Sequence, residues 1–290
     1  MSAGIDAADL ATRLRLHRCR NQWRGQCPVC AYPEAFALSA SKGGRLLGWC
    51  ASCQDGTAIA HLLAEMQGGA AAPERVEQRD AAARQARTFE RAMALWNGSE
   101  PVPGTLAGRY LTARGLPHLA ASSALRFRPD CSHPSRARLP AMIALVQGAD
   151  GDPVGIHRTY LRRDGSAKAN IEPPRAALGQ VRGGAIRLDP LAAEIVIGEG
   201  IETAASAGLL LGLPAWSAVS AGNMGHALML PTQVRCVAIA ADPGEPGRRA
   251  AAAAWHRWTA EGLRVRISTP KGEGDCNDIL MRRLALGGGT

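Results

Sequence analysis

The sequence has few aromatic side chains and no long apolar run. Aromatic residues make up 4% of its 290 positions, and no stretch of 18 consecutive apolar residues is present to form a transmembrane helix. The N-terminus also lacks the pattern of a secretory signal peptide, so we expect a cytoplasmic protein. No Gly-x4-Gly-Lys-Ser/Thr loop occurs, which excludes a P-loop motor within this sequence.

The composition nevertheless indicates metal ligands and a polyanionic partner. Disulfides are rare in a reducing cytoplasm, so the eight cysteines are better interpreted as metal ligands and core residues. The net charge is +9, from 34 basic and 25 acidic residues, and such an excess favours nucleic acid as a partner. A soluble protein that is simply basic is the alternative. The length allows two domains and a small appendage.

Two Cys-x-x-Cys pairs predict a zinc ribbon in residues 1–66. Nineteen residues separate Cys27 and Cys30 from Cys50 and Cys53, a spacing typical of four-cysteine zinc sites. The segments 35–39 and 45–49 alternate like a hairpin between the pairs. Four thiolates leave no open position, so the zinc would be structural; redox dithiols are the alternative. Trp49, beside basic residues of this ribbon, either stacks on single-stranded nucleic acid or packs the small core.

The middle of the chain predicts a linker with a charged helix (67–104) and a basic α+β domain (105–187). Strands at 140–147 and 153–161 form a hairpin around a Gly-Asp-rich turn. Basic residues follow along and after its second strand: Arg158, Arg162, Arg163 and Lys168. We interpret them as a surface for a phosphate-bearing ligand, with a solvated hairpin tip as the alternative.

Residues 188–290 predict a Rossmann-like parallel sheet. Apolar strands at 194–199, 215–219, 235–241 and 264–268 alternate with helices, which is typical of an α/β fold. Acidic residues follow three of these strands: Glu199, Asp242, Asp275 and Asp278. Ligands bind outside the carboxyl ends of parallel strands, so these acids could converge on one divalent metal.

Four segments give the sequence a family resemblance. GEGIETAASAG, HRTYLRRDGSAKA and DCNDIL resemble the primase-type TOPRIM proteins of phages and mobile elements, and GQCPVC…GWCASC resembles their N-terminal zinc-finger module. The resemblance implies a DNA primase-like nucleotidyltransferase that copies single-stranded DNA from nucleoside triphosphates, with Mg²⁺ or Mn²⁺, and a replicative helicase acting in trans. It implies Arg158 and Lys168 as cations for nucleotide and template.

The resemblance also implies roles for the acids. Glu199 would be the general acid/base, with Asp242 and Asp278 as further catalytic acids. The metal ligands it implies are Glu199, Asp242, Glu245, Asp275 and Asp278. The family pattern after the third strand is Asp-x-Asp, but Gly244 stands where the second Asp is expected. Either Glu245 replaces it, or metal affinity and catalysis are reduced.

Two other functions remain open on the same scaffold. A TOPRIM nuclease or topoisomerase is one, although a topoisomerase needs a tyrosine nucleophile and neither Tyr32, Tyr110 nor Tyr160 lies in a suggestive context. The other is a non-catalytic protein that binds single-stranded DNA or assists priming.

Overall fold

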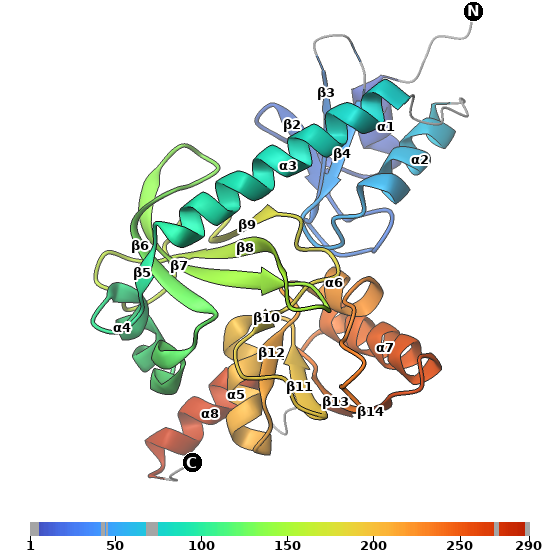
Figure 1. The fold of residues 1–290 in the computed structure, drawn as a ribbon. Coiled ribbons are helices and arrows are strands. Elements are labelled where there is room, and N and C mark those ends of the chain that lie inside the picture. The colour runs from blue at the N-terminus through green and yellow to red at the C-terminus, as the bar shows by residue number, and fades with distance from the viewer. Residues whose placement is uncertain (1–5, 42–43, 45, 68–74, 270–272, 288–290) are drawn as a thin grey trace, which may run out of the picture.

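The computed structural model describes residues 6–41, 44, 46–67, 75–269 and 273–287, with residues 75–81 described by their helical backbone alone. Three β-sheets follow one another along the chain, each with its own helices (Figure 1). The predicted fold class is confirmed: a mixed α/β chain with a four-cysteine cluster near the N-terminus and a largely parallel sheet in the C-terminal part. None of the helices in the described residues is long and apolar enough to cross a bilayer.

The N-terminal sheet carries the cysteines. It is antiparallel in the order β1 (His17–Cys19), β2 (Gln22–Gly25), β3 (Phe36–Ala40) and β4 (Leu46–Cys50). The β3–β4 hairpin lies one residue beyond the predicted segments, and part of its turn (42, 43 and 45) lies outside the described residues. Helices α1 (Ala7–Arg13) and α2 (Gly56–Met66) cover it, and Phe36, Leu38 and Ile59 fill the core between them.

The second sheet is also antiparallel. Its order is β5 (Glu100–Pro101), β6 (Leu125–Ser132), β7 (Arg138–Gln147), β8 (Pro153–Tyr160) and β9 (Arg175–Gly179). Alternation along β7 divides its side chains between two cores. Ala141 and Ile143 pack under α3 (Arg75–Asn97). Met142 and Ala144 pack under α4 (Leu106–Ala113), a 3₁₀ turn (Pro117–Ala121) and helix α5 (Ile201–Leu211) of the third sheet.

The third sheet has the order β10-β12-β11-β13-β14. The four strands β11 (Glu194–Gly198), β12 (Ala215–Ser217), β13 (Cys236–Ala240) and β14 (Arg264–Ser268) are parallel, as predicted. The edge strand β10 (Ile186–Arg187) is antiparallel to β12. Because it precedes residue 188, the predicted start of this domain leaves out a strand of its sheet.

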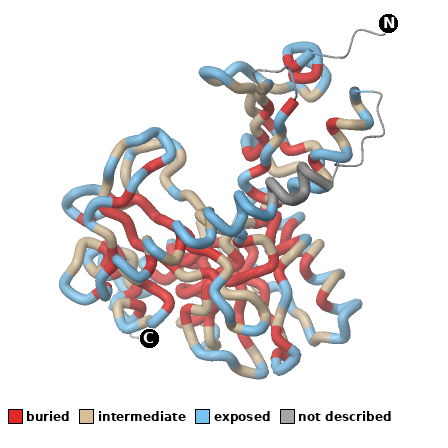
Figure 2. Tube along the Cα trace, turned by 45° about the horizontal axis from the view of Figure 1, so that its top comes forward, coloured by how far each residue is buried: buried red, intermediate tan, exposed pale blue. Residues whose placement is uncertain are grey.

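Helices cover both faces of the third sheet. Helices α5 (Ile201–Leu211) and α8 (Cys276–Ala285) pack on one face, and α6 (Ala221–His226) and α7 (Glu245–Ala260) on the other. Strands buried on both faces are near-continuous apolar runs, which explains Ile195, Val196 and Ile197 in β11. Figure 2 shows the buried segments concentrated in the second and third sheets, which share one core through α5.

Candidate functional site

The four predicted zinc ligands form one cluster. The sulfur atoms of Cys27, Cys30, Cys50 and Cys53 all lie within 4.8 Å of one another. The Cys27–Cys53 and Cys30–Cys50 sulfur pairs are 4.0 and 3.7 Å apart. A tetrahedral ion with 2.3 Å bonds to sulfur requires separations of ~3.8 Å. The amides of Ser52 and Cys53 also donate to the Cys50 sulfur at 3.3 and 3.4 Å, so the donor set fits a structural zinc.

Glu199 and Asp242 lie at the carboxyl edge of the third sheet. They follow β11 and β13, two paired strands in which Gly198 lies opposite Ala240. The segments that carry the two acids therefore leave the sheet at the same level. Burial raises the pKa of Glu199, and the charge of Asp242 raises it further. Burial also raises the pKa of Asp242, with an added contribution from Asp275. The three carboxylates are therefore electrostatic neighbours.

One atom of this group favours a cation. Asp242 Oδ1 is buried and has no hydrogen-bond partner among the described residues. A buried carboxylate oxygen without a partner is costly, and a hard divalent ion would satisfy it. The unpartnered oxygen therefore favours a carboxylate that binds a metal such as Mg²⁺ over one that is purely structural.

The other predicted acids lie at helix starts. Asp275 and Asp278 form a reciprocal capping box at the first turn of α8, in which each carboxylate accepts the other residue's amide at 3.0 Å. Glu245 begins α7, points to solvent and pairs with Arg248 at 3.3 Å. Within the described residues, the cysteine cluster is the one set of three or more ligands close enough to share an ion. The five acids thus do not close around a single point.

The basic residues predicted to bind nucleic acid divide into two groups. Arg158 is 7% exposed and donates to the carbonyls of Ser132, Ala176 and Ala177 at 3.0–3.3 Å. These bonds tie β8 to β6 and β9, so the Arg158 guanidinium is engaged within the second sheet. Arg162 and Arg163, just after β8, are exposed.

Lys168 is held in a partly buried ion pair. Its ammonium lies 2.9 Å from Glu202 Oε1, in the first turn of α5, and the Tyr110 hydroxyl donates to the same oxygen. Although burial opposes ionisation, Lys168 and the Tyr110 hydrogen bond lower the pKa of Glu202 to about 2. Next to them, burial lowers the pKa of His157 to about 3, so this imidazole is neutral.

Two residues near the acids were not predicted. Arg175 is the exposed first residue of β9, and its positive charge offsets part of the rise in the pKa of both Glu199 and Asp242. Its Nη1 lies 3.5 Å from the position that a Cβ on Gly200 would take. Tyr32, from the zinc ribbon, donates its hydroxyl to Glu199 Oε1 at 3.4 Å. Burial and the Glu199 charge raise the pKa of Tyr32 to about 12. No motif marked either residue.

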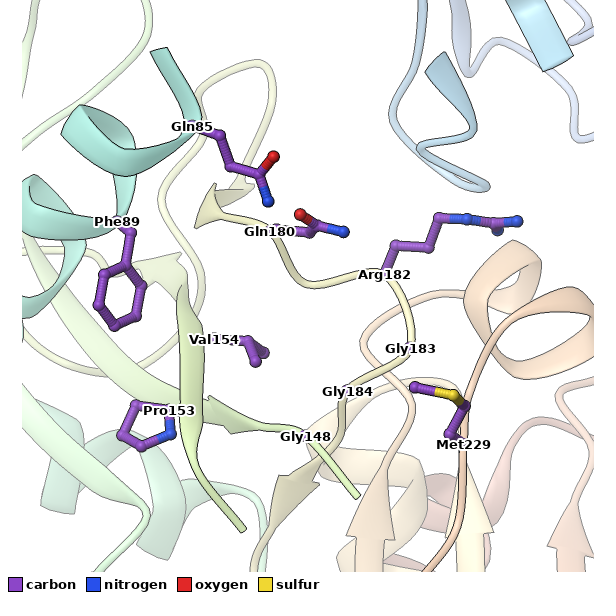
Figure 3. Close-up of a pocket in the computed structure, with 10 residues that line it drawn as sticks. All are labelled: Gln85, Phe89, Gly148, Pro153, Val154, Gln180, Arg182, Gly183, Gly184 and Met229. Carbon is purple, nitrogen blue, oxygen red and sulfur yellow. The ribbon is translucent and has the colours of Figure 1, made fainter. Parts of the chain in front are cut away.

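A separate pocket of about 390 Å³ lies between α3, the β7–β8 hairpin and the loop before β10 (Figure 3). Phe89, Val154 and Met229 form its apolar walls, and Gln180 and Arg182 line it from the loop. None of the predicted site residues lines this pocket. The acid group and the pocket are therefore distinct places.

Comparison with known families divides the chain near residue 190. Residues 194–285 match the Toprim domain family, which confirms the predicted TOPRIM module. Residues 86–188 match a family described as a domain of unknown function, DUF7146. No curated protein matches the chain in sequence.

Solved structures similar to the chain include primases. The zinc-binding and RNA polymerase domains of the Aquifex aeolicus primase share 16% identity at a TM-score of 0.45, covering 98% of this chain and 83% of that one. The primase fragment of the bacteriophage T7 primase-helicase shares 15% identity at 0.40, covering 91% and 95%. The RNA polymerase domain of Mycobacterium tuberculosis primase DnaG shares 15% identity at 0.45, covering 70% and 80%.

Proposed function

Residues 194–285 of this chain form a Toprim domain, and we propose that the protein is a DNA primase-like nucleotidyltransferase that makes short primers on single-stranded DNA. The observation that carries the proposal is the carboxylate pair of Glu199 and Asp242 at the edge of the sheet, with one buried oxygen unpartnered. Nucleotidyl transfer joins a hydroxyl to the α-phosphate of a nucleoside triphosphate and releases pyrophosphate. It needs groups that hold a divalent metal and bind phosphate oxygens.

The residues divide these tasks. Asp242 and Glu199, with Asp275 beside them, would hold Mg²⁺ or Mn²⁺, which would neutralise charge on the triphosphate when bound. The raised pKa of Glu199 suits a carboxylate that accepts the proton of the attacking hydroxyl. Arg175 is exposed and its charge acts on both acids, and we assign it to the triphosphate. Asp278 and Glu245 lie at the rim of the site, where their negative charge would favour the approach of the metal ion.

Single-stranded DNA would bind on the zinc ribbon and the basic middle domain. Trp49 is 50% exposed on β4, an accessible ring on which a base can stack. Arg162 and Arg163 are exposed at the end of β8 and would contact phosphates, whereas Lys168 would act mainly by holding Glu202. Because the sequence has no P-loop, we propose that a helicase acts in trans; a pull-down with the helicase of the same genetic element checks this.

The test is primer synthesis with labelled nucleoside triphosphates and Mg²⁺ or Mn²⁺, comparing the wild type with Glu199→Gln. We expect product from the wild type and at least a 100-fold loss in the variant, since general acid–base catalysis contributes ~10²–10⁴-fold. Glu194→Gln is the matched control: Glu194 starts the same strand but pairs with Arg266 at 3.2 Å on the surface. Wild-type protein that binds DNA without making product would contradict the proposal.

A non-catalytic accessory role is the second candidate. The observation that favours it is the pair Gly244 and Glu245: the former brings no carboxylate, and the latter faces solvent beside Arg248. If neither wild type nor variant makes primers, this candidate replaces the first. DNA cleavage without nucleotides would instead favour a Toprim nuclease.

A further inference from the structure

The second zinc knuckle is packed tightly against the start of α6. The Ser220 hydroxyl donates to the Ser52 carbonyl at 2.7 Å, and the Gly222 amide donates to the Ser52 hydroxyl at 3.0 Å. A Cβ added to Gly222 would lie 2.7 Å from the Cys53 amide nitrogen. The knuckle thus sits directly on the third sheet's helical layer (Figure 1).

Two arginines tie the ribbon down on either side. Arg182 donates to Asp55 Oδ2 at 2.8 Å and to the Cys53 carbonyl at 3.3 Å, and its pair with Asp55 is largely shielded from solvent. Arg249, in α7, donates to the Ala31 carbonyl beside the first knuckle at 3.0 Å. The second knuckle is therefore anchored on α6 and on the loop before β10, and the first knuckle on α7.

This docking brings Tyr32 onto Glu199. The main chain of the first knuckle fixes Tyr32, because the Tyr32 carbonyl accepts a hydrogen bond from the Cys27 amide at 2.9 Å. The half-buried ring packs against the core under α6 and α7, and the hydroxyl donates to Glu199 Oε1 at 3.4 Å. The Ala221 amide, at the start of α6, is a further donor to this carboxylate, so Glu199 is held from both the zinc ribbon and the Toprim unit.

We propose that Tyr32 is a positioning residue for Glu199, supplied by the zinc ribbon, so that the divalent-metal affinity of the acid pair depends on the ribbon being docked. The proposal rests on the proposed function only for the assignment of Glu199 and Asp242 as metal ligands. The physical reason is that a donor on one oxygen restricts rotation of the carboxylate. Partners of this kind orient ligands and tune metal affinity.

The test measures Mn²⁺ binding to the full-length, zinc-loaded protein by calorimetry, without DNA or nucleotides. Tyr32→Phe removes the hydroxyl and keeps the ring, and we expect it to weaken Mn²⁺ binding ~10-fold, with zinc content and melting temperature unchanged. Tyr160→Phe is the matched control. Its hydroxyl donates to the Ser132 carbonyl at 2.9 Å within the second sheet, so Mn²⁺ binding should stay at the wild-type level.

A second pair of variants tests the docking itself. Arg182→Gln removes the tie to Asp55 and should weaken Mn²⁺ binding in the same direction. Combined with Tyr32→Phe it should add little, because both changes act through one contact. Arg138→Gln, which breaks an exposed pair with Asp130 in the second sheet, is the control and should change nothing.

The outcomes separate this inference from the proposed function. Unchanged or tighter Mn²⁺ binding in Tyr32→Phe would overturn it, since a tighter site would mean that the tyrosine competes with the metal. Wild-type protein without Glu199-dependent Mn²⁺ binding would overturn it as well. Glu199-dependent binding that Tyr32→Phe weakens, in a protein that makes no primers, would support the inference while contradicting primer synthesis.

Discussion

Gly244 stands where the family resemblance implies a second Asp, and its backbone has a conformation that L side chains rarely adopt. Its φ of 97° and ψ of 162° precede the first turn of α7, a combination that is open essentially to glycine alone. We predict that Gly244→Asp and Gly244→Ala destabilise the protein by a similar ~1–3 kcal/mol, measured by denaturant unfolding, because the strain comes from the backbone. The control is Gly56→Ala, at the start of α2 with open space around it, which should not destabilise. A stabilising Gly244→Asp would show that this loop accepts the acid.

Glu202 gives the protein an acid-sensitive ion pair. Its pKa of about 2, against an ordinary 4.5, means that the folded state favours the carboxylate. The stabilisation is complete above pH 4.5 and is lost as the pH falls towards 2. We predict that Glu202→Gln lowers the free energy of unfolding at pH 7 by about 2–3 kcal/mol, and that the difference from the wild type narrows below pH 4.5.

Urea unfolding at several pH values measures this. Glu194→Gln is the control, because Glu194 belongs to an exposed pair. It should change the free energy of unfolding by about 0–1 kcal/mol at most, at every pH. A Glu202→Gln difference that stays constant with pH would contradict the ion-pair explanation.

At the scale of the element, alternation along β4 decides what the ribbon offers to a ligand. Leu46 and Cys50 face the ribbon core, whereas Leu47 and Trp49 are 47% and 50% exposed on its outer face. We predict that Trp49→Ala weakens binding to single-stranded DNA by about 1–3 kcal/mol, with unchanged zinc content. Fluorescence anisotropy with a labelled oligonucleotide measures it.

Trp255 provides the comparison for Trp49. It is also partly exposed, at 36%, but lies on α7 with its indole nitrogen donating to the Val265 carbonyl. Trp255→Ala should leave the affinity for single-stranded DNA unchanged. Equal losses in both variants would indicate a general effect on folding, and no loss in Trp49→Ala would assign this ring to another task.

At the scale of the whole molecule, the arrangement of the ribbon on the Toprim unit depends on one small residue. Gly222 lies against Cys53 and Ser52, and any side chain there would force the second knuckle away. We predict that Gly222→Ala loosens the docking and increases the radius of gyration measured by small-angle X-ray scattering, while zinc content stays at one ion per chain. Gly56→Ala should leave the scattering unchanged. An unchanged profile for Gly222→Ala would show that the contact yields locally.

The sequence by itself determined the elements and the nature of the chemistry. Paired cysteines predicted the four-cysteine cluster, because four thiolates at this spacing have few uses other than binding a metal. Apolar runs ending in acids predicted parallel strands and placed Glu199 and Asp242 at one edge, since the carboxyl ends of such strands share a side. Local spacing carries this information directly.

Only the tertiary structure decided which polar residues meet. Arg158 and Lys168 share a motif with Arg162 and Arg163, yet the first two are engaged within the protein and the last two are exposed. Arg175 and Tyr32 reach the acids from β9 and from the zinc ribbon, 24 and 167 residues away in sequence. Such contacts depend on how three sheets dock, and docking is set by shape and burial that no local pattern records.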